Sequence, residues 1–394
     1  MGAMVPRSDL ISAAQFWFEM AEGLEWRCYD PYDLLASPYL RRCPEISTFA
    51  ARALVQIGRR SGTAIRRLLR IAPHEEAQVL ATFLRSAALL ARCGEAWAGR
   101  YVEPLMCRLA AKATTAPPGC GWGLEFPVAT RFGFRPRRLP NIYQTLVALS
   151  ALMDAEGLGG SVADVSLLTD GSRFVTKHLA TFEYAGQSWL RYWPRSDDPI
   201  VNVQALASGV FARLGARLGE HHLLALADRA AATVLGVQRG DGSWPYSADG
   251  RATFVDGFHT GFILEGLSEY MRWRPHGPGC ETGQAVRAGF RYYKQHLLSA
   301  NAQPRAFADG PVSLDGQTAA QCVQTLTICA ADPLDASVGL RVWESINRRH
   351  GPNAARRWPG DGSFPALRWT IAPAALATAH LVRALESPNG AAET

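Results

Sequence analysis

The sequence lacks several features that would place the protein in a membrane or outside the cell. No apolar run approaches the ~18 uninterrupted residues that a membrane helix needs. The N-terminus has no charged region followed by a hydrophobic signal core. The eight cysteines show no CxxC spacing, which argues against a disulfide framework and indicates reduced thiols. We therefore predict a cytoplasmic protein without a membrane span.

Lysine is scarce as well, because only three of the 41 basic residues are lysines and arginine carries the net charge of +6. The arginines are dispersed and no nucleic-acid reading motif is present, so we predict no nucleic-acid partner. The 394 residues are 48% hydrophobic and 19% charged. This composition is typical of a compact protein with a large core and excludes a disordered or fibrous chain.

Alternating strand patterns are absent, and nearly every segment has the 3.6-residue apolar period of a helix. Five small, apolar segments recur at intervals of 54 to 61 residues, and they start at Asn141, Asn202, Asp256, Asp315 and Ala372. More amphipathic helices lie between them. We predict an all-α fold, a single α/α toroid of six hairpins and about twelve helices over residues 1–394, with less regular hairpins in about 1–115. An open solenoid is the alternative.

Glycine turns that end in an aromatic residue form a second regular feature. They occupy Gln238 to Tyr246, Trp358 to Pro365 and Pro118 to Pro127. Turn chemistry is usually structural, so we interpret these segments as staples of the toroid. In the first of them, hydrogen bonding and stacking by Gln238 and Trp244 would tie a helix end to its neighbour.

The segment VDGFHTGFILEGL places Asp256 and His259 on the same side of a first helical turn. His259 could act as a general base, with Asp256 orienting it or serving as acid, and Asp315 would supply a second carboxylate. Two carboxylates across a cleft would support glycoside hydrolysis. A histidine paired with Tyr143 or Tyr246 would suit proton abstraction by a lyase or epimerase. The structural alternative makes Asp256 a helix cap and His259 an interior residue.

A toroid gathers the N-terminal ends of its inner helices around one end of a central cleft, where free amides favour anionic groups. The amide and aromatic side chains expected there suit hydrogen bonding to a polyol and stacking on a sugar ring. We predict a small-molecule or glycan substrate. The predicted substrate-binding residues are Trp122, Asn141, Tyr143, Asn202, Gln204, Trp244, Tyr246, Gln317 and Gln321.

The stretch RAAATVLGVQRGDGSW resembles the QW repeat of squalene-hopene and oxidosqualene cyclases. The Asp256 segment resembles the part of protein prenyltransferase β-subunits in which an aspartate and a histidine help bind catalytic zinc. Both resemblances imply an α/α toroid, and they keep an isoprenoid cyclase or prenyltransferase-like enzyme with non-standard acids as an alternative, since no DxDD is present. Asp256 and His259 supply at most two zinc ligands, so Cys322 or Asp315 would have to complete the site. We predict no cofactor and no bound metal.

A wider resemblance covers most of the chain. YDPYDLLASPYLRR from Tyr29, GWGLEFP, LPNIYQTLVALSALMDA, DGSWPY, VDGFHTGF and DGQTAAQ are similar, in order, to a family of bacterial toroid proteins found with exopolysaccharide genes. Members commonly have Asn where this chain has Gly257, and His where it has Gln317. The missing histidine implies a changed or lost activity, so a non-catalytic scaffold is the third alternative.

Overall fold

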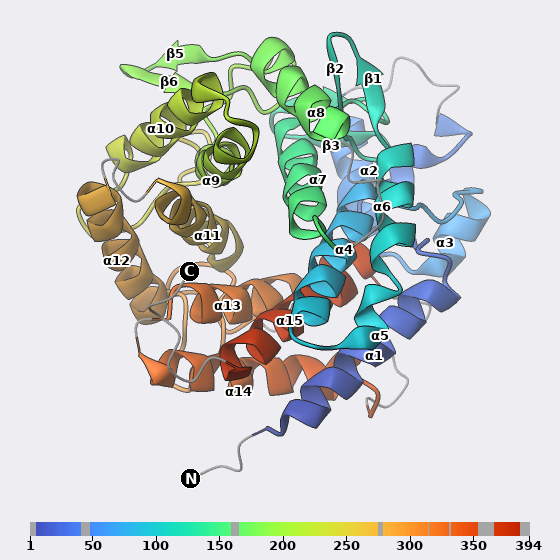
Figure 1. Ribbon diagram of the computed structural model, residues 1–394. Coiled ribbons are helices and arrows are strands. Elements are labelled where there is room, and N and C mark those ends of the chain that lie inside the picture. Colours follow the sequence, from blue (N-terminus) through green and yellow to red (C-terminus); the bar gives the residue numbers. More distant parts are fainter. Residues whose placement is uncertain are drawn as a thin grey trace.

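A computed structural model describes residues 5–40, 48–158, 165–274, 279–313, 315–330, 332–353 and 366–386. Twelve of the described helices form two concentric layers, shown in Figure 1. The inner layer is α4 (Ala77–Arg92), α7 (Ile142–Asp154), α9 (Val201–Leu218), α11 (Gly257–Trp273), α13 (Gly316–Ile328) and α15 (Ala372–Glu386). The outer layer is α1 (Arg7–Gly23), α6 (Val102–Ala111), α8 (Val165–His178), α10 (His221–Gly236), α12 (Gly279–His296) and α14 (Pro333–His350).

The inner helices form a closed ring. Each packs against the next in chain order, and α15 returns to pack against α4 (Figure 1). Each inner helix also contacts one outer helix, in the pairs α4–α6, α7–α8, α9–α10, α11–α12, α13–α14 and α15–α1. An open solenoid would leave its first and last helices apart. The predicted all-α toroid is therefore confirmed.

Short strands and helices lie along the chain between the helices of the two layers. Three antiparallel hairpins pair β1 (Thr114–Ala116) with β2 (Gly119–Gly121), β3 (Val128–Thr130) with β4 (Gly133–Arg135), and β5 (Phe182–Tyr184) with β6 (Gln187–Trp189). Strands of three residues are too short to show an alternating pattern, which explains why the sequence did not predict them. The remaining elements are η1 (Asp33–Ala36), α2 (Thr48–Arg60), α3 (Thr63–Leu68), α5 (Ala96–Gly99) and the π-helical turn η3 (Leu367–Ile371).

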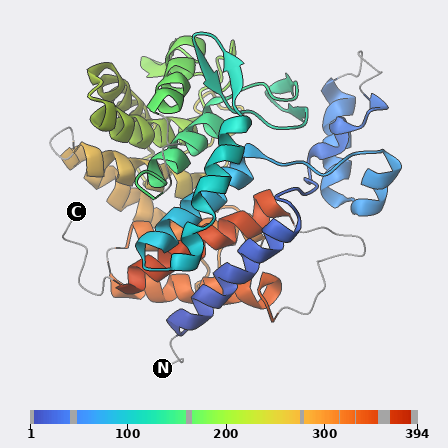
Figure 2. The same ribbon diagram turned by 45° about the vertical axis from the view of Figure 1, so that its right-hand side comes forward.

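The segment that carries η1, α2 and α3 lies beside the barrel and not in either layer, as Figure 2 shows. There α2 packs against η1 and against the β3–β4 hairpin. No described helix is long and apolar enough to cross a membrane. The six described cysteines are free, and these are Cys28, Cys93, Cys107, Cys120, Cys322 and Cys329.

Polar caps explain where three of the inner helices begin. The side chains of Asn141, Asp256 and Asp315 each accept a hydrogen bond from the backbone N–H three residues later, at 2.7 to 3.0 Å. Such bonds satisfy amides that have no partner within the helix. Asn202 is different, because α9 begins at Val201 and its cap position is Ile200.

The glycine turn after α10 is a structural staple, as the sequence predicted. Gln238 Nε2 donates to the carbonyls of Gly242 at 3.0 Å and Ala285 at 2.9 Å, and the second bond ties the turn to α12. Trp244 Nε1 donates back to Val234 O at 3.0 Å. Gly242 has a φ of +92°, a conformation that side chains with a Cβ rarely adopt. The turn predicted at 358–365 lies outside the described residues.

Two contacts cross the axis of the barrel. Arg85 on α4 pairs with Glu265 on α11 at 3.3 Å, and these helices stand opposite each other in the ring. The rings of Tyr143 on α7 and Phe262 on α11 also meet, with centroids 5.7 Å apart. Arg85 and Glu265 lie midway along their helices, whereas Tyr143 lies in the first turn of α7.

Candidate active site at the N-terminal ends of the inner helices

Asp256 and His259 form a carboxylate–imidazole pair at the start of α11. Asp256 Oδ1 accepts the backbone N–H of His259 at 2.7 Å, and Oδ2 lies 2.6 Å from His259 Nδ1. One carboxylate thus caps the helix and also fixes the imidazole, so the capping and orienting interpretations of Asp256 both hold. The His259 side chain is 28% exposed, and no described residue hydrogen-bonds to its Nε2. This nitrogen is therefore open to a substrate.

Aromatic rings surround the imidazole. Tyr246 meets His259 edge to face with centroids 4.6 Å apart, and Phe258 lies at 5.1 Å. Phe254 stacks on Tyr246 at 5.1 Å. Burial raises the pKa of Tyr246, and the nearby charge of Asp256 raises it further, so the phenol stays protonated and can donate a hydrogen bond.

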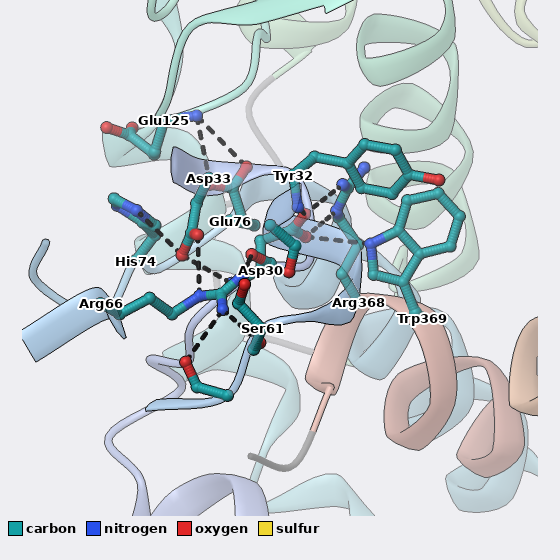
Figure 3. Close-up of polar contacts among 12 residues, drawn as sticks. Asp30, Tyr32, Asp33, Ser61, Arg66, His74, Glu76, Glu125, Arg368 and Trp369 are labelled. Atoms are coloured by element: carbon teal, nitrogen blue, oxygen red, sulfur yellow. Dashed lines mark hydrogen bonds and ion pairs between the residues drawn. The ribbon is translucent and has the colours of Figure 1, made fainter. Parts of the chain in front are cut away.

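A second polar group lies at the start of α15 and is shown in Figure 3. Arg368 grips Asp30 with two bonds, Nε to Oδ2 at 2.6 Å and Nη2 to Oδ1 at 2.8 Å. Trp369 Nε1 donates to Asp30 Oδ2 at 3.0 Å. Two parallel N–H···O bonds fix the plane of the guanidinium. The Arg368 side chain is 11% exposed and Asp30 3%, so Arg368 is the more accessible partner.

Glu76 lies next to this pair, at the cap position of α4. Its carboxyl oxygens both lie 3.2 Å from the backbone nitrogen of Glu125, which donates to them. Burial raises the pKa of Glu76 to about 8; Arg368 lowers it, and the charge of Asp30 opposes Arg368. Glu76 is therefore mostly protonated at neutral pH and can act as a proton donor.

The loop that supplies Asp30 is anchored by a buried ion pair. Arg66 Nε donates to Asp33 Oδ1 at 2.9 Å, and both side chains are fully buried (Figure 3). Arg66 also donates to the carbonyls of Asp30 at 2.7 Å and Ser61 at 2.6 Å. Burial raises the pKa of Asp33 to about 6, while Arg66 lowers it. These contacts hold Asp30 in position and do not involve His259.

The charge of Arg368 affects the pKa of tyrosines at the same end of the barrel. Burial raises the pKa of both Tyr143 and Tyr192, and the charge of Arg368 lowers both. The hydroxyl of Tyr246 in turn raises the pKa of Tyr192. Tyr192 lies beside the start of α7, because its backbone carbonyl accepts a hydrogen bond from Ile142 N at 3.0 Å. All three phenols are protonated donors at neutral pH.

The remaining predicted residues fall into different settings. Tyr143 is half-buried, and its hydroxyl accepts a bond from Gln78 at 2.9 Å. Asn202 Oδ1 and Gln321 Nε2 are buried without a hydrogen-bond partner, while Gln317 is half-buried. These amides keep capacity for further hydrogen bonds.

Asp315 differs from Asp256 although both cap inner helices. Its Oδ1 accepts from Thr318 N at 3.0 Å and its Oδ2 from Ser313 Oγ at 2.7 Å. Asp315 is exposed. Both of its oxygens are engaged by Thr318 and Ser313, whereas Oδ2 of Asp256 holds the imidazole of His259.

Three of the predicted substrate-binding residues are buried in the structure. Trp122 and Trp244 are 0% and 1% exposed, and their Nε1 groups donate to Leu109 O and Val234 O. Gln204 is also fully buried and exchanges two hydrogen bonds with the backbone of Leu190. Neighbouring residues cover the faces of these side chains, and their polar atoms are hydrogen-bonded within the protein.

The sequence interpretation missed Glu76, Asp30, Arg368 and Tyr192. The YDPYD segment that contains Asp30 was noticed only as part of a resemblance. Glu76 precedes a helix three positions before an apolar run, a position typical of an ordinary cap. Arg368 gives no local signal, because its partner lies 338 residues away.

A zinc site at Asp256 and His259 would need a third ligand from the protein. Cys322, one of the two candidates, is fully buried. Within the described ranges, no three His, Cys, Asp or Glu side chains are grouped so that they could hold a metal ion. The donor set does not fit a zinc ion.

No protein-family model matches this chain, and no curated protein matches it. Its fold is similar to that of the unsaturated glucuronyl hydrolase of Bacillus sp. GL1, with 11% identity and a TM-score of 0.59 over 96% of each chain. A cellobiose 2-epimerase from Bacillus thermoamylovorans shares 8% identity and a TM-score of 0.59, over 80% of this chain and 90% of the other. The GH76 α-mannanase of Bacteroides thetaiotaomicron shares 12% identity and a TM-score of 0.56, over 80% and 87%. At these identities the similarity establishes the α/α toroid fold.

Proposed function

We propose that the protein is an enzyme that abstracts and returns a proton on a sugar-derived substrate at the N-terminal ends of the inner helices. The observation that carries this proposal is the Asp256–His259 pair, in which the carboxylate holds Nδ1 at 2.6 Å while Nε2 has no described partner. A histidine held in this way is a suitable general base.

In the proposed reaction, His259 Nε2 takes the proton from a carbon next to the substrate's carbonyl or carboxyl group. The C–H bond breaks, its electron pair moves toward that group, and Asp256 stabilises the imidazolium that forms. The developing negative charge can be met by Arg368 and by the neutral hydroxyls of Tyr192 and Tyr246. The imidazolium exchanges its proton with solvent and returns one to the other face of the carbon after the intermediate has turned, and this gives an epimer.

Hydrolysis by two carboxylates fits this site less well. It requires two carboxyl groups that face the glycosidic bond. The oxygens of Asp315 serve the α13 cap and Ser313, and those of Asp30 are held by Arg368 and Trp369. The carboxylate of Asp256 is already engaged by its own histidine.

A sugar is favoured over an isoprenoid because polar groups alternate with the aromatic rings at this end. Phe254 and Phe258 could contact either ligand, but Arg368, Glu76 and the amide of Gln317 suit hydroxyl or carboxylate groups. The structural neighbours named above act on a glucuronyl sugar, cellobiose and a mannan, as their names state. The shared fold supports a sugar substrate without identifying it.

The test is solvent deuterium exchange. The protein is incubated in D2O with reducing disaccharides and with uronate-containing oligosaccharides, and carbon-bound deuterium is measured by NMR. We expect incorporation by the wild type and a loss of about 10²-fold or more in His259→Gln, the range for removal of a general base. His296→Gln is the matched control, since His296 forms an exposed pair with Asp309 at 3.0 Å. New reducing ends without deuterium, no reaction with any sugar, or equal rates in wild type and His259→Gln would refute the proposal.

A further inference from the structure

A pocket of about 340 Å3 lies at the other end of the barrel, among the C-terminal halves of the inner helices. All six inner helices contribute to its walls, so the ring itself builds the pocket. Its volume is within the range of sites for small molecules. The Arg85–Glu265 pair crosses the axis and lines this pocket, whereas His259 lies in the first turn of α11.

Positive charge exceeds negative charge in this pocket. Five arginines and three carboxylates line it, and these are Arg85, Arg92, Arg213, Arg272, Arg383, Asp154, Glu265 and Glu269. All three carboxylates already have arginine partners: Asp154 and Glu265 pair with Arg85, and Glu269 pairs with Arg272 at 2.8 Å. Arg213 also pairs with Asp154 and Glu269, so Arg92 and Arg383 are the lining arginines without a carboxylate partner among the described residues.

Arg383 is the arginine whose charge is least compensated. Among the described residues, none of the carboxylates lies within ion-pair distance of it, and its one side-chain hydrogen bond runs from Nη2 to His380 Nδ1 at 3.4 Å. Burial lowers the pKa of Arg383, and the charge of Arg272 lowers it further. A half-buried guanidinium that faces another cation costs free energy unless an anion joins it.

His380, one turn before Arg383 on α15, carries a buried polar atom that also bears on this pocket. It is 6% exposed, and burial holds its pKa well below the usual value, so the imidazole is neutral. Because Nδ1 accepts the bond from Arg383, the ring proton is on Nε2. That Nε2–H is buried and has no acceptor among the described residues. A buried donor of this kind is rare and requires an explanation.

We propose that this pocket binds a small molecule through a phosphate or carboxylate group, with Arg383 and the Nε2–H of His380 as the anion contacts. An anionic oxygen would accept the orphan His380 proton and pair with the guanidinium. The structural alternative is that the arginines only complement the C-terminal helix dipoles. That alternative explains exposed arginines, but it leaves the buried donor of His380 without a partner.

Isothermal titration of the full-length protein tests the proposal, with inorganic phosphate and acetate as separate probes at constant ionic strength in chloride. We expect saturable binding of one or both, and the probe that binds identifies the group. Arg383→Gln should weaken binding about tenfold or more, the usual cost of a lost charge-assisted hydrogen bond. Arg229→Gln on the exposed face of α10 is the control and should bind like the wild type.

Two further variants keep the test decisive. Arg383→Lys keeps the charge and should recover part of the affinity for the anion. This variant replaces Arg383→Gln in the binding test if Arg383→Gln fails to fold. His259→Gln should bind the anion normally, which separates this pocket from the proposed active site. The proposal is overturned if neither anion binds saturably, or if binding is the same in wild type and folded Arg383 variants.

Discussion

The two ends of the barrel differ in how their charges are arranged. At the N-terminal end each main acid has its own partner: Asp256 holds His259 at 2.6 Å, and Arg368 grips Asp30 with two bonds. At the C-terminal end arginines outnumber carboxylates, and a buried donor on His380 has no acceptor. One end is therefore organised by internal ion pairs, whereas the other carries arginines without a described carboxylate partner.

For the Asp256–His259 pair, this difference follows from the positions of the two residues in the sequence. Pairs such as Asp256 and His259 lie within one helical turn, so the helix itself fixes their geometry. At the C-terminal end the arginines project from different helices and share the same few carboxylates. A carboxylate–imidazole pair held within one helix suits catalysis, because catalysis needs groups in fixed positions. Arginines without a carboxylate partner suit the binding of an anion.

The largest expected effect compares the two capping aspartates. Asp256→Ala should lower turnover about 10²-fold or more, because His259 loses the group that orients it and stabilises its charged form. Asp315→Ala should leave turnover nearly unchanged. Both variants should lose about 1 kcal/mol of unfolding free energy with the cap. Deuterium exchange and urea unfolding measure these quantities, and equal losses of turnover would remove the distinction between the two residues.

Breaking the contact across the axis should have the largest effect on stability. Arg85→Leu leaves Glu265 without its arginine and removes one partner of Asp154. We expect a loss of about 3 kcal/mol in unfolding free energy, typical of a broken buried ion pair. The double variant Arg85→Leu with Glu265→Leu should recover part of this loss, because no charge is stranded. A single variant as stable as the wild type would contradict the account.

Glu76 should make the N-terminal end sensitive to pH. Its pKa in the folded protein is about 8, above the ordinary value, so the folded state holds the proton more tightly. The resulting stabilisation is complete below the ordinary pKa and is lost as pH rises toward about 8. Between about pH 5 and pH 7 the wild type should lose about 2 kcal/mol relative to Glu76→Gln. Parallel stability profiles of the two proteins would show that Glu76 ionises normally.

The smallest expected effect concerns the C-terminal end in the absence of anions. Arg383→Met removes a half-buried charge that has no described carboxylate partner, so the unfolding free energy should rise by about 1 kcal/mol. Thermal unfolding in dilute chloride buffer measures this change. Loss of stability instead would mean that Arg383 serves packing, and the contrast between the two ends would weaken.

The sequence predicted the toroid and the Asp256–His259 pair because both depend on local patterns. Apolar periods mark the inner helices, and Asn141, Asp256 and Asp315 cap them as polar residues commonly do. The same patterns did not show that Trp122, Trp244 and Gln204 are buried and hydrogen-bonded within the protein. Aromatic rings and amides are used for packing as often as for binding. The sequence does not show which of these side chains are covered or hydrogen-bonded by neighbouring helices.

The remaining features depend on contacts between distant parts of the chain. Arg368 meets Asp30 across 338 residues, and Arg85 meets Glu265 across 180. The C-terminal pocket arises only when six helices close into a ring. None of these residues has a distinctive local motif, and therefore the sequence alone predicted neither the Arg368 group nor the pocket.

The most direct test of the central claim is a crystal structure with a bound oligosaccharide that the protein accepts as substrate. We predict electron density for a sugar ring at the N-terminal ends of the inner helices, with a substrate atom within hydrogen-bond distance of His259 Nε2. A sugar bound only among the arginines of the C-terminal pocket would contradict the account.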